Sequence, residues 1–375
     1  MSKTTIYADH AATTALSPVA YEAMLPWLQD KYGNPSTLYS LARDPRKAVA
    51  HSREVIAAAI NADPSEIFFT SGGTEADNWA LKGTMFQHNR GKGMITSAIE
   101  HHAILNSCAA LERMGYAIDT LPVDQMGIVC AQTLRSALTD NISLVSIMLA
   151  NNEIGTIEPV VELAEITHQT DVLFHTDAVQ AIGHIPVDVK ALQVDMLSAS
   201  AHKFNGPKGI GFLYTRKGVH LIPLLNGGSQ EHGMRAGTEN VAGIVGMAAA
   251  LQEHIEKLAQ ETKYLSALSC RLLDQLKSKD LDFCINGSQE RIPGSLSLSF
   301  KGADGEMMLH RLDLMGTAVA TGSACDSKNV VLSHVIRAIE VPQEYAHGTI
   351  RITLGMDNTP EQMDKIAHQI ETVLH

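Results

Sequence analysis

The stretch Ser198-Ala199-Ser200-Ala201-His202-Lys203-Phe204-Asn205-Gly206-Pro207-Lys208-Gly209 decides the interpretation of this chain. It places one lysine after hydroxyl and imidazole side chains and before a glycine-rich turn. A lysine amine becomes a nucleophile toward aldehydes only when desolvation or nearby cations lower its pKa. Most lysines are instead solvated surface residues. A chemical role for Lys203 therefore requires supporting groups elsewhere in the sequence.

A first supporting group is the acid that ends an upstream apolar run. The run Leu173–Gln180 reads as a short strand that ends at Asp177, and doubly wound sheets bind ligands at such strand ends. A carboxylate there can pair with the protonated pyridine nitrogen of pyridoxal phosphate, the cofactor that a Schiff-base lysine carries. Gln180 is spaced to donate to the phenolate oxygen of that cofactor. The commoner use of an acid like Asp177 is a helix N-cap or turn residue, and that alternative stays open.

A second supporting feature is a candidate phosphate site. The stretch Ile67–Ala76 runs from an apolar strand through a Ser-Gly-Gly-Thr turn into a helix-forming segment. Backbone N–H groups at a helix N-terminus bind anions, and Thr74 adds a hydroxyl. The turn lacks the lysine and the spacing of a Walker P-loop. An ordinary N-capped turn is the alternative, and the presence of Lys203 and Asp177 disfavours it.

These residues belong to a larger set that resembles one family. The chain is similar to the cysteine desulfurases, which are pyridoxal-phosphate enzymes of fold type I and are class V aminotransferase-like. The motifs that carry the resemblance cover almost the whole chain in order: Tyr7–Thr14, Gly33–Thr37, Ser71–Asn78, Glu100–His102, Asn151–Gly155, Asp177–Gln180, His202–Lys203, Arg235–Thr238, Thr321–Cys325 and Ile350–Gly355.

The resemblance implies a role for each matching residue. Lys203 would bond to pyridoxal 5'-phosphate and shuttle protons, His101 would stack on the cofactor ring and act in acid–base steps, and Arg351 would clamp the substrate carboxylate with help from Asn152. Thr238 would reach the phosphate of a neighbouring subunit, which implies a homodimer. The expected cofactor-binding residues are Gly73, Thr74, His101, Asn152, Asp177, Gln180, Ser200, His202, Lys203 and Thr238.

Cys325 decides which reaction is expected. It lies in the small, polar run Gly322–Asn329, whose composition favours a loop. As a thiolate it would take sulfur from the substrate as a persulfide. The neighbouring Asp326 disfavours the thiolate and Lys328 favours it, so the sequence leaves the pKa of this thiol open. Free cysteines are more often buried and inert, and this is the expectation for Cys108, Cys130, Cys270 and Cys284.

Three functions are weighed. The favoured one is a desulfurase that converts L-cysteine to L-alanine and delivers the sulfur on Cys325 to an acceptor protein of iron–sulfur cluster assembly or of a thiolation pathway. The second is a selenocysteine lyase or another pyridoxal-phosphate β-lyase, in which Cys325 is dispensable. The third is a scaffold subunit without activity. Intact Lys203, Asp177, His101 and Arg351 argue against the scaffold, and Cys325 favours the desulfurase over the lyases.

Composition agrees with a cytoplasmic enzyme. The 375 residues carry 29 basic and 41 acidic side chains, so the net charge is -12, which argues against a nucleic-acid-binding surface. The five cysteines include no C-x-x-C pair and favour a reducing compartment. The 17 histidines form no metal-binding motif, so no metal is expected. No signal core or membrane span is expected either.

Periodicity predicts an α/β architecture. Short apolar strands alternate with helical stretches such as Ile104–Met114 and Val161–Thr170, which implies a mainly parallel sheet. A long helix is expected over Val241–Leu276, and Ser295–Phe300 alternates like a half-buried antiparallel strand. The expected strands are Ile67–Thr70, Met94–Ser97, Leu144–Met148, Leu173–His175, Met196–Ala199 and Gly211–Tyr214.

Two domains are expected from this pattern. Residues 15–255 would form a large cofactor-binding domain. Residues 1–14 and 256–375 would form a smaller α+β domain that carries the loop with Cys325.

Three features depart from many members of the family. Tyr39 stands where many relatives have histidine, and Leu332 where many have proline. The last helix is expected to end near Leu374, without the docking segment of members that serve an iron–sulfur scaffold. These departures concern the transfer of sulfur to the acceptor rather than the binding of the cofactor.

Overall fold

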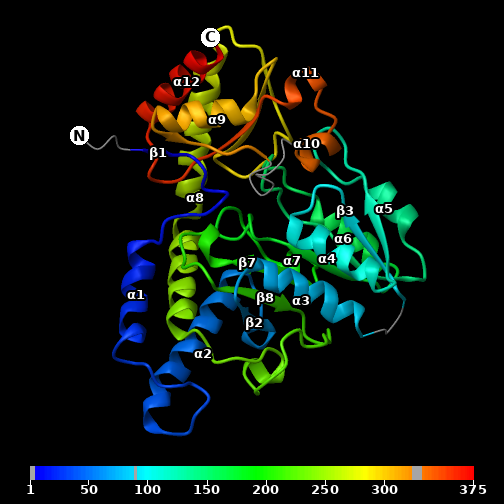
Figure 1. The fold of residues 1–375 in the computed structure, drawn as a ribbon. Helices are drawn as coiled ribbons and strands as arrows, with labels where there is room; N and C mark the ends of the chain where they lie inside the picture. Colours follow the sequence, from blue (N-terminus) through cyan, green and yellow to red (C-terminus); the bar gives the residue numbers. More distant parts are fainter. Residues whose placement is uncertain (1–4, 88–90, 323–331) are drawn as a thin grey trace.

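The large sheet is mainly parallel, as the sequence predicts. The computed structural model describes residues 5–87, 91–322 and 332–375, and within these ranges it contains a seven-stranded sheet in the order β2-β8-β7-β6-β5-β3-β4 (Figure 1). In this described sheet only β8 runs antiparallel to its neighbours. The strands are β2 (Ile67–Thr70), β3 (Gly93–Ser97), β4 (Ala117–Leu121), β5 (Ile142–Ser146), β6 (Leu173–Asp177), β7 (Met196–Ser200) and β8 (Gly211–Thr215).

Helices cover both faces of this sheet. Successive side chains of a strand point to opposite faces, and here both faces are apolar: Met94 packs in the core of one face and Ile95 in that of the other. The first face carries α3 (Gly73–Met85) and α4 (His102–Arg113). The second face carries α1 (Pro18–Leu28), α2 (Arg43–Ala59), α5 (Ala131–Ala137), α6 (Val160–His168), α7 (Val189–Leu192) and the first half of α8 (Val241–Lys277).

Helix α8 joins two hydrophobic cores. It is 37 residues long and runs from the sheet into the upper part of the molecule (Figure 1). Ile244 and Leu251 pack under the large sheet, whereas Leu268 and Leu276 pack in a separate core. The expected boundary between residues 255 and 256 falls inside α8, and the division into domains 15–255 and 1–14 with 256–375 stays a prediction.

The second core surrounds a three-stranded antiparallel sheet, in which β10 lies between β9 and β12. The short β1 pairs in parallel with β11 beside it. The strands are β1 (Ile6–Tyr7), β9 (Phe283–Ile285), β10 (Ser295–Phe300), β11 (Thr317–Ala318) and β12 (Thr349–Thr353). The helices are α9 (Gly305–Leu314), α10 (His334–Ala338), α11 (Gln343–Ala346) and α12 (Pro360–Leu374), and single 3-10 turns are η1 (Ser40–Ala42), η2 (Pro64–Glu66), η3 (Ala201–Lys203) and η4 (Glu231–Gly233).

The prediction that β10 is half-buried is wrong, although its antiparallel pairing is confirmed. All six residues of the strand are buried. The serine face is covered because Asn286 Nδ2 donates to Ser297 Oγ at 3.1 Å and to Ser299 Oγ at 2.8 Å, and Ser299 Oγ bonds to Thr349 Oγ1 at 2.6 Å. Alternating serines therefore marked a buried polar layer, because buried hydroxyls are tolerated when they are hydrogen-bonded.

The role of α8 in the second core is testable by truncating Leu268. This side chain is 2% exposed, so Leu268→Ala should lower the free energy of unfolding by about 2–5 kcal/mol through lost burial and a residual cavity. Leu314→Ala, at a leucine that is 79% exposed, is the matched control and should change it by less than about 0.5 kcal/mol. Urea unfolding measures both, and equal losses would contradict the packing.

Candidate active site

One cavity gathers the predicted site residues at the carboxyl ends of β6 and β7. Its volume is about 390 Å³. All the predicted residues that the structure describes line it except Thr238. The lining residues come from the N-terminal segment, the starts of α3, α4 and α10, the stretch after β5, the ends of β6 and β7 with the residues that follow them, Gly322, and β12. They are Ala11, Ala12, Gly73, Thr74, Asp77, His101, His102, Met148, Asn152, Glu153, Asp177, Val179, Gln180, Ser200, His202, Lys203, Gly322, His334 and Arg351.

Lys203 is held in place by the N-terminal segment. It ends η3, which directly follows β7. Its Nζ donates to the carbonyl oxygens of Ala11 and, at 2.9 Å, Ala12. Gln180 Nε2 donates to the same Ala11 oxygen at 3.0 Å, and His184 Nε2 donates to the Lys203 carbonyl at 2.9 Å. The amine and the Gln180 amide therefore converge on one backbone oxygen.

Asp177 lies at the end of β6 with its carboxylate toward the cavity. The backbone N–H of Val179 donates to Asp177 Oδ1 at 2.9 Å. Burial raises the pKa of Asp177, and the nearby imidazole of His101 opposes this. A cation placed against this carboxylate would be strongly favoured, since the surroundings are poorly hydrated.

The strand β6 carries a buried histidine two residues before Asp177. His175 lies between Ser146 Oγ at 2.9 Å and Ser198 Oγ at 3.0 Å. Burial lowers the pKa of His175 to about 3, so the ring is neutral. Strands β5, β6 and β7 are thereby linked side by side beneath the cavity.

The start of α3 forms an anion cradle. Its N-cap is Gly72, which has no side chain to bond the first N–H groups of the helix, so these donors remain available to a ligand. The chain is also close to its neighbours here, because a Cβ on Gly73 would lie 2.5 Å from Val179 Cγ2. Ser200 and Thr74 add hydroxyls to the same cavity.

An ion pair fixes the turn that leads into this helix. Arg235 donates to both oxygens of Glu75, at 2.8 Å from Nε and 3.0 Å from Nη2. The Ser71 N–H donates to Glu75 Oε2 at 2.8 Å. Two parallel hydrogen bonds hold both planar groups in one orientation, so the cradle is preorganised.

The two predicted histidines of the cofactor region are both buried enough to favour neutral rings. His101 caps α4, and its Nδ1 accepts from the Ala103 N–H at 3.1 Å, which leaves the proton of the neutral ring on Nε2. Burial lowers the pKa of His101. Burial, followed by the charges of Lys203 and Lys208, lowers the pKa of His202 to about 4. His202 Nδ1 lies 3.1 Å from Thr13 Oγ1.

Arg351 provides the second cation of the cavity. Its Nη2 donates to Asp9 Oδ1 at 2.6 Å and its Nη1 donates to the Asn152 carbonyl at 2.9 Å. The buried Nε has no hydrogen-bond partner among the residues that the structure describes. A buried donor without a partner is costly, which favours the binding of an anion such as a carboxylate.

Several lining residues were missed by the sequence analysis. Asp77, His102, Glu153 and His334 are titratable groups of this cavity. Asp77, His102 and Glu153 belong to quoted motifs, which was the available signal, but membership of a motif does not show which side chains point into the cavity. Burial raises the pKa of Glu153 to about 7, and Ser333 Oγ donates to Glu153 Oε2 at 2.6 Å.

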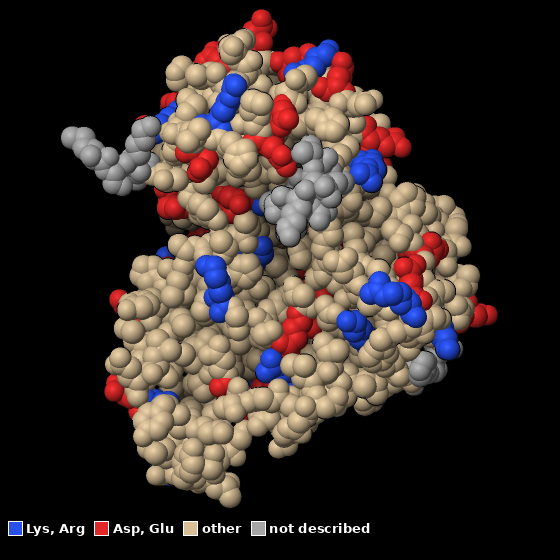
Figure 2. All heavy atoms as spheres, in the orientation of Figure 1, with Lys and Arg blue, Asp and Glu red and all other residues tan. Residues whose placement is uncertain are grey.

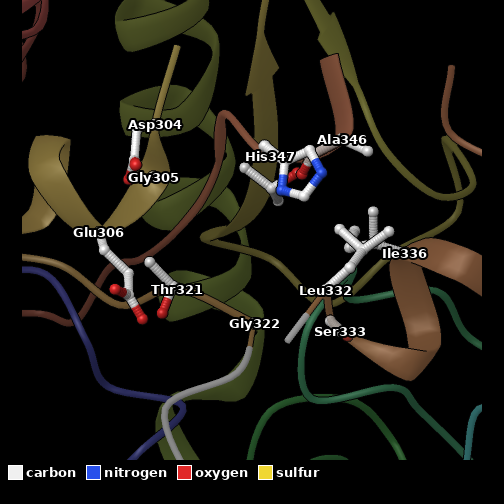
Figure 3. Close-up of a pocket in the computed structure, with 11 residues that line it drawn as sticks. Asp304, Gly305, Glu306, Thr321, Gly322, Leu332, Ser333, Ile336, Ala346 and His347 are labelled. Carbon is white, nitrogen blue, oxygen red and sulfur yellow. The ribbon is translucent and has the colours of Figure 1, made fainter. Parts of the chain in front are cut away.

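The structure does not bring two predicted site residues, Thr238 and Cys325, together with the others, for different reasons. Thr238 is exposed in this chain, and its expected contact with the phosphate of a neighbouring subunit stays a prediction. Cys325 lies outside the described residues. Gly322 and Ser333, which are described, lie close to each other, because a Cβ on Gly322 would lie 3.1 Å from Ser333 Cβ. Figure 3 shows Gly322, Leu332 and Ser333 together at one side of a small pocket beside the start of α9.

The expectation that the other cysteines are buried is wrong for two of them. Cys108 is buried within α4, and Cys284 in β9 is partly buried. Cys130 and Cys270 are exposed. Cys130 is the N-cap residue of the short α5, and Cys270 lies on the solvent side of the long α8.

The fold and the cavity define an α/β enzyme with a lysine, an anion cradle and a carboxylate at a strand end. The aminotransferase class-V family model matches residues 6–366. A relative named cysteine desulfurase IscS, from Dictyoglomus turgidum (strain DSM 6724 / Z-1310), is 49% identical and spans 99% of this chain and 95% of its own.

Solved structures agree with this assignment. A structure described as a NifS-like protein is 38% identical, covers 99% of both chains and has a TM-score of 0.93. Another, described as SspA in complex with cysteine, is 34% identical, covers 93% of this chain and 99% of its own, and has a TM-score of 0.83. The chain belongs to the class-V aminotransferase family, and within it to the cysteine desulfurases.

Within the described residues, no helix is long and apolar enough to cross a membrane.

Proposed function

We propose that the protein is a pyridoxal-phosphate-dependent cysteine desulfurase that converts L-cysteine to L-alanine and takes the sulfur onto Cys325. The observation that carries this proposal is the convergence of Lys203, Asp177 and Arg351 on one cavity. These side chains supply a covalent anchor, a partner for a ring nitrogen and a carboxylate clamp. Membership of the cysteine desulfurases supports the same reaction.

The residues of the cavity fit the cofactor. The uncapped start of α3, with Thr74, Ser200 and His202, suits a phosphate, and the buried carboxyl of Asp177 suits a protonated pyridine nitrogen. Gln180 would hold the phenolate oxygen. When bound to Lys203, pyridoxal phosphate supplies an electron sink for bonds at the substrate carbon next to the amine. His101 would stack on its ring.

The substrate would be oriented by Arg351 and Asn152. The unpartnered Nε of Arg351 is a donor for the carboxylate of L-cysteine. The thiolate of Cys325 would then form a bond to the substrate sulfur while the carbon–sulfur bond breaks. The electron pair stays on the carbon, which takes a proton and becomes the methyl group of alanine. Cys325 is left with the persulfide.

The persulfide needs an acceptor. A thiol of a second protein would remove the sulfur by exchange, and we propose an acceptor of iron–sulfur cluster assembly or of a thiolation pathway. A free catalytic thiol requires a reducing compartment, which supports the cytoplasm.

We also propose that the working unit is a homodimer. Large apolar side chains are exposed along α1 and the segment that follows it, and this surface includes Val19, Tyr21, Leu25, Leu28, Tyr32, Leu38, Tyr39 and Leu41. In Figure 2 the lowest part of the molecule, at the lower left, is mostly tan, with a few charged side chains at its left edge. Large exposed apolar patches mark interaction surfaces. The exposed Thr238 would then be available to the cradle of the second subunit.

The desulfurase reaction is tested by the products formed from L-cysteine with a thiol reductant. The protein loaded with pyridoxal phosphate should release alanine and sulfide in equal amounts. Cys325→Ala should keep the bound cofactor and lower alanine formation by at least about a hundredfold, because the sulfur has no acceptor. Cys270→Ala, at an exposed cysteine, is the matched control and should be fully active. Pyruvate as the product, or full activity of Cys325→Ala, would mean a lyase.

The dimer is tested by light scattering during size-exclusion chromatography. The mass should be twice that of the 40.5 kDa chain. The double variant Leu28→Asp with Leu38→Asp should give a monomer with weakened cofactor binding, because it places charges in the apolar surface. Leu314→Asp is the control at another exposed leucine. A fully active wild-type monomer would contradict the proposal.

A further inference from the structure

Four histidines line the cavity within the described residues: His101, His102, His202 and His334. His334 is the first residue of α10 and lines the cavity together with Gly322 and Arg351. It stands next to Ser333, which caps this helix and closes the stretch that contains Cys325.

The hydrogen bond of His334 fixes its tautomer. Its Nε2 lies 2.9 Å from the backbone oxygen of Glu100. A carbonyl oxygen only accepts, so Nε2 carries the proton and Nδ1 of the neutral ring is an acceptor. Burial lowers the pKa of His334, and His102, His101 and Arg337 lower it further, against the bond to Glu100. Nδ1 has no hydrogen-bond partner within the part of the chain that the structure describes.

His101 and His334 consequently present opposite hydrogen-bonding atoms, one a donor and the other an acceptor. The Nδ1 of His101 is occupied by the Ala103 N–H, so this ring offers a donor at Nε2. His334 is occupied at Nε2 and offers an acceptor at Nδ1. The backbone groups that the two rings bind set this difference, and a substrate that carries both a donor and an acceptor can use both rings.

The surroundings of His334 hold its ring in one orientation. The ring of His102 packs edge-on against it, with centroids 4.9 Å apart and an interplanar angle of 60°. Glu100 is fixed in turn, because its Oε1 accepts from Ser97 Oγ at 2.7 Å and from the Met148 N–H at 2.9 Å.

The helix that carries His334 is also packed firmly. Val335 and Ile336 contact an apolar cluster that includes Ile99, Met148 and Ile154. At the start of the helix, Ser333 Oγ bonds to Glu153 at 2.6 Å. A ring held this way loses little freedom when a ligand binds, which favours a binding role.

We propose that His334 is a substrate-binding residue whose Nδ1 accepts a hydrogen bond from the thiol of L-cysteine. This inference rests on the proposed function. With the carboxylate at Arg351 and the amine at the cofactor that Lys203 would hold, the remaining polar substituent of the substrate is the side chain. Among the described lining groups near Gly322, His334 presents a ring nitrogen as an acceptor in a fixed orientation, whereas the Glu153 carboxyl is already bonded to Ser333. The product L-alanine has no thiol, so this contact favours substrate over product.

The test compares L-cysteine with L-alanine on the same cofactor-loaded protein. Binding is followed by the visible absorbance of the cofactor in a Cys325→Ala background, in which sulfur cannot be transferred. His334→Gln keeps a donor for the Glu100 oxygen but has no acceptor at the Nδ1 position. His334→Asn places an amide oxygen close to that position. His310→Gln, at an exposed histidine of α9, is the control.

In His334→Gln, the affinity for L-cysteine should fall about fivefold, as expected for one lost neutral hydrogen bond, while the affinity for L-alanine stays unchanged. His334→Asn should retain part of the preference for cysteine. An unchanged ratio of the two affinities in His334→Gln, or an equal loss for both amino acids, would overturn the inference. A parent protein that binds neither amino acid would instead contradict the proposed function itself.

Discussion

The site depends on how the N-terminal segment is held between the two cores. Thr353 N–H donates to the Ala8 oxygen at 2.9 Å, which ties the segment to β12. Thr14 N–H donates to the His202 oxygen at 3.0 Å, which ties it to the turn after β7. Between these two points, Ala11 and Ala12 accept from Lys203. Because β12 carries Arg351 and η3 carries Lys203, the register of this short segment brings the two cations to one cavity.

Burial of carboxyl groups shapes the charge of that cavity. Burial raises the pKa of Glu153 to about 7 and of Glu100, beneath the wall, to about 8, and it raises the pKa of Asp77 as well. Glu100 is therefore largely protonated near neutral pH and Glu153 partly so, which reduces the negative charge around Arg351 and Lys203. A cavity of this kind favours ligands with a phosphate or a carboxylate.

The sequence predicts most of the sheet and the ends of the strands where ligands bind, because buried parallel strands read as apolar runs. It fails where the burial of polar residues depends on distant partners, as for the serines of β10 with Asn286. It also gives Asp177 and Lys203 from local patterns, but not His334, whose tautomer is set by a backbone oxygen 234 residues away. Cys130 and Cys270 show that residue type alone does not settle exposure.

The central claim is that Lys203 holds the cofactor opposite Asp177, and peptide mass spectrometry tests it most directly. The protein is loaded with pyridoxal phosphate, reduced with borohydride to make the lysine bond permanent, and digested. The account predicts that the mass of the cofactor is found on Lys203, and that Lys203→Ala loses it together with the visible absorbance. A modified Lys208 in place of Lys203, or a protein that binds no cofactor, would contradict the account.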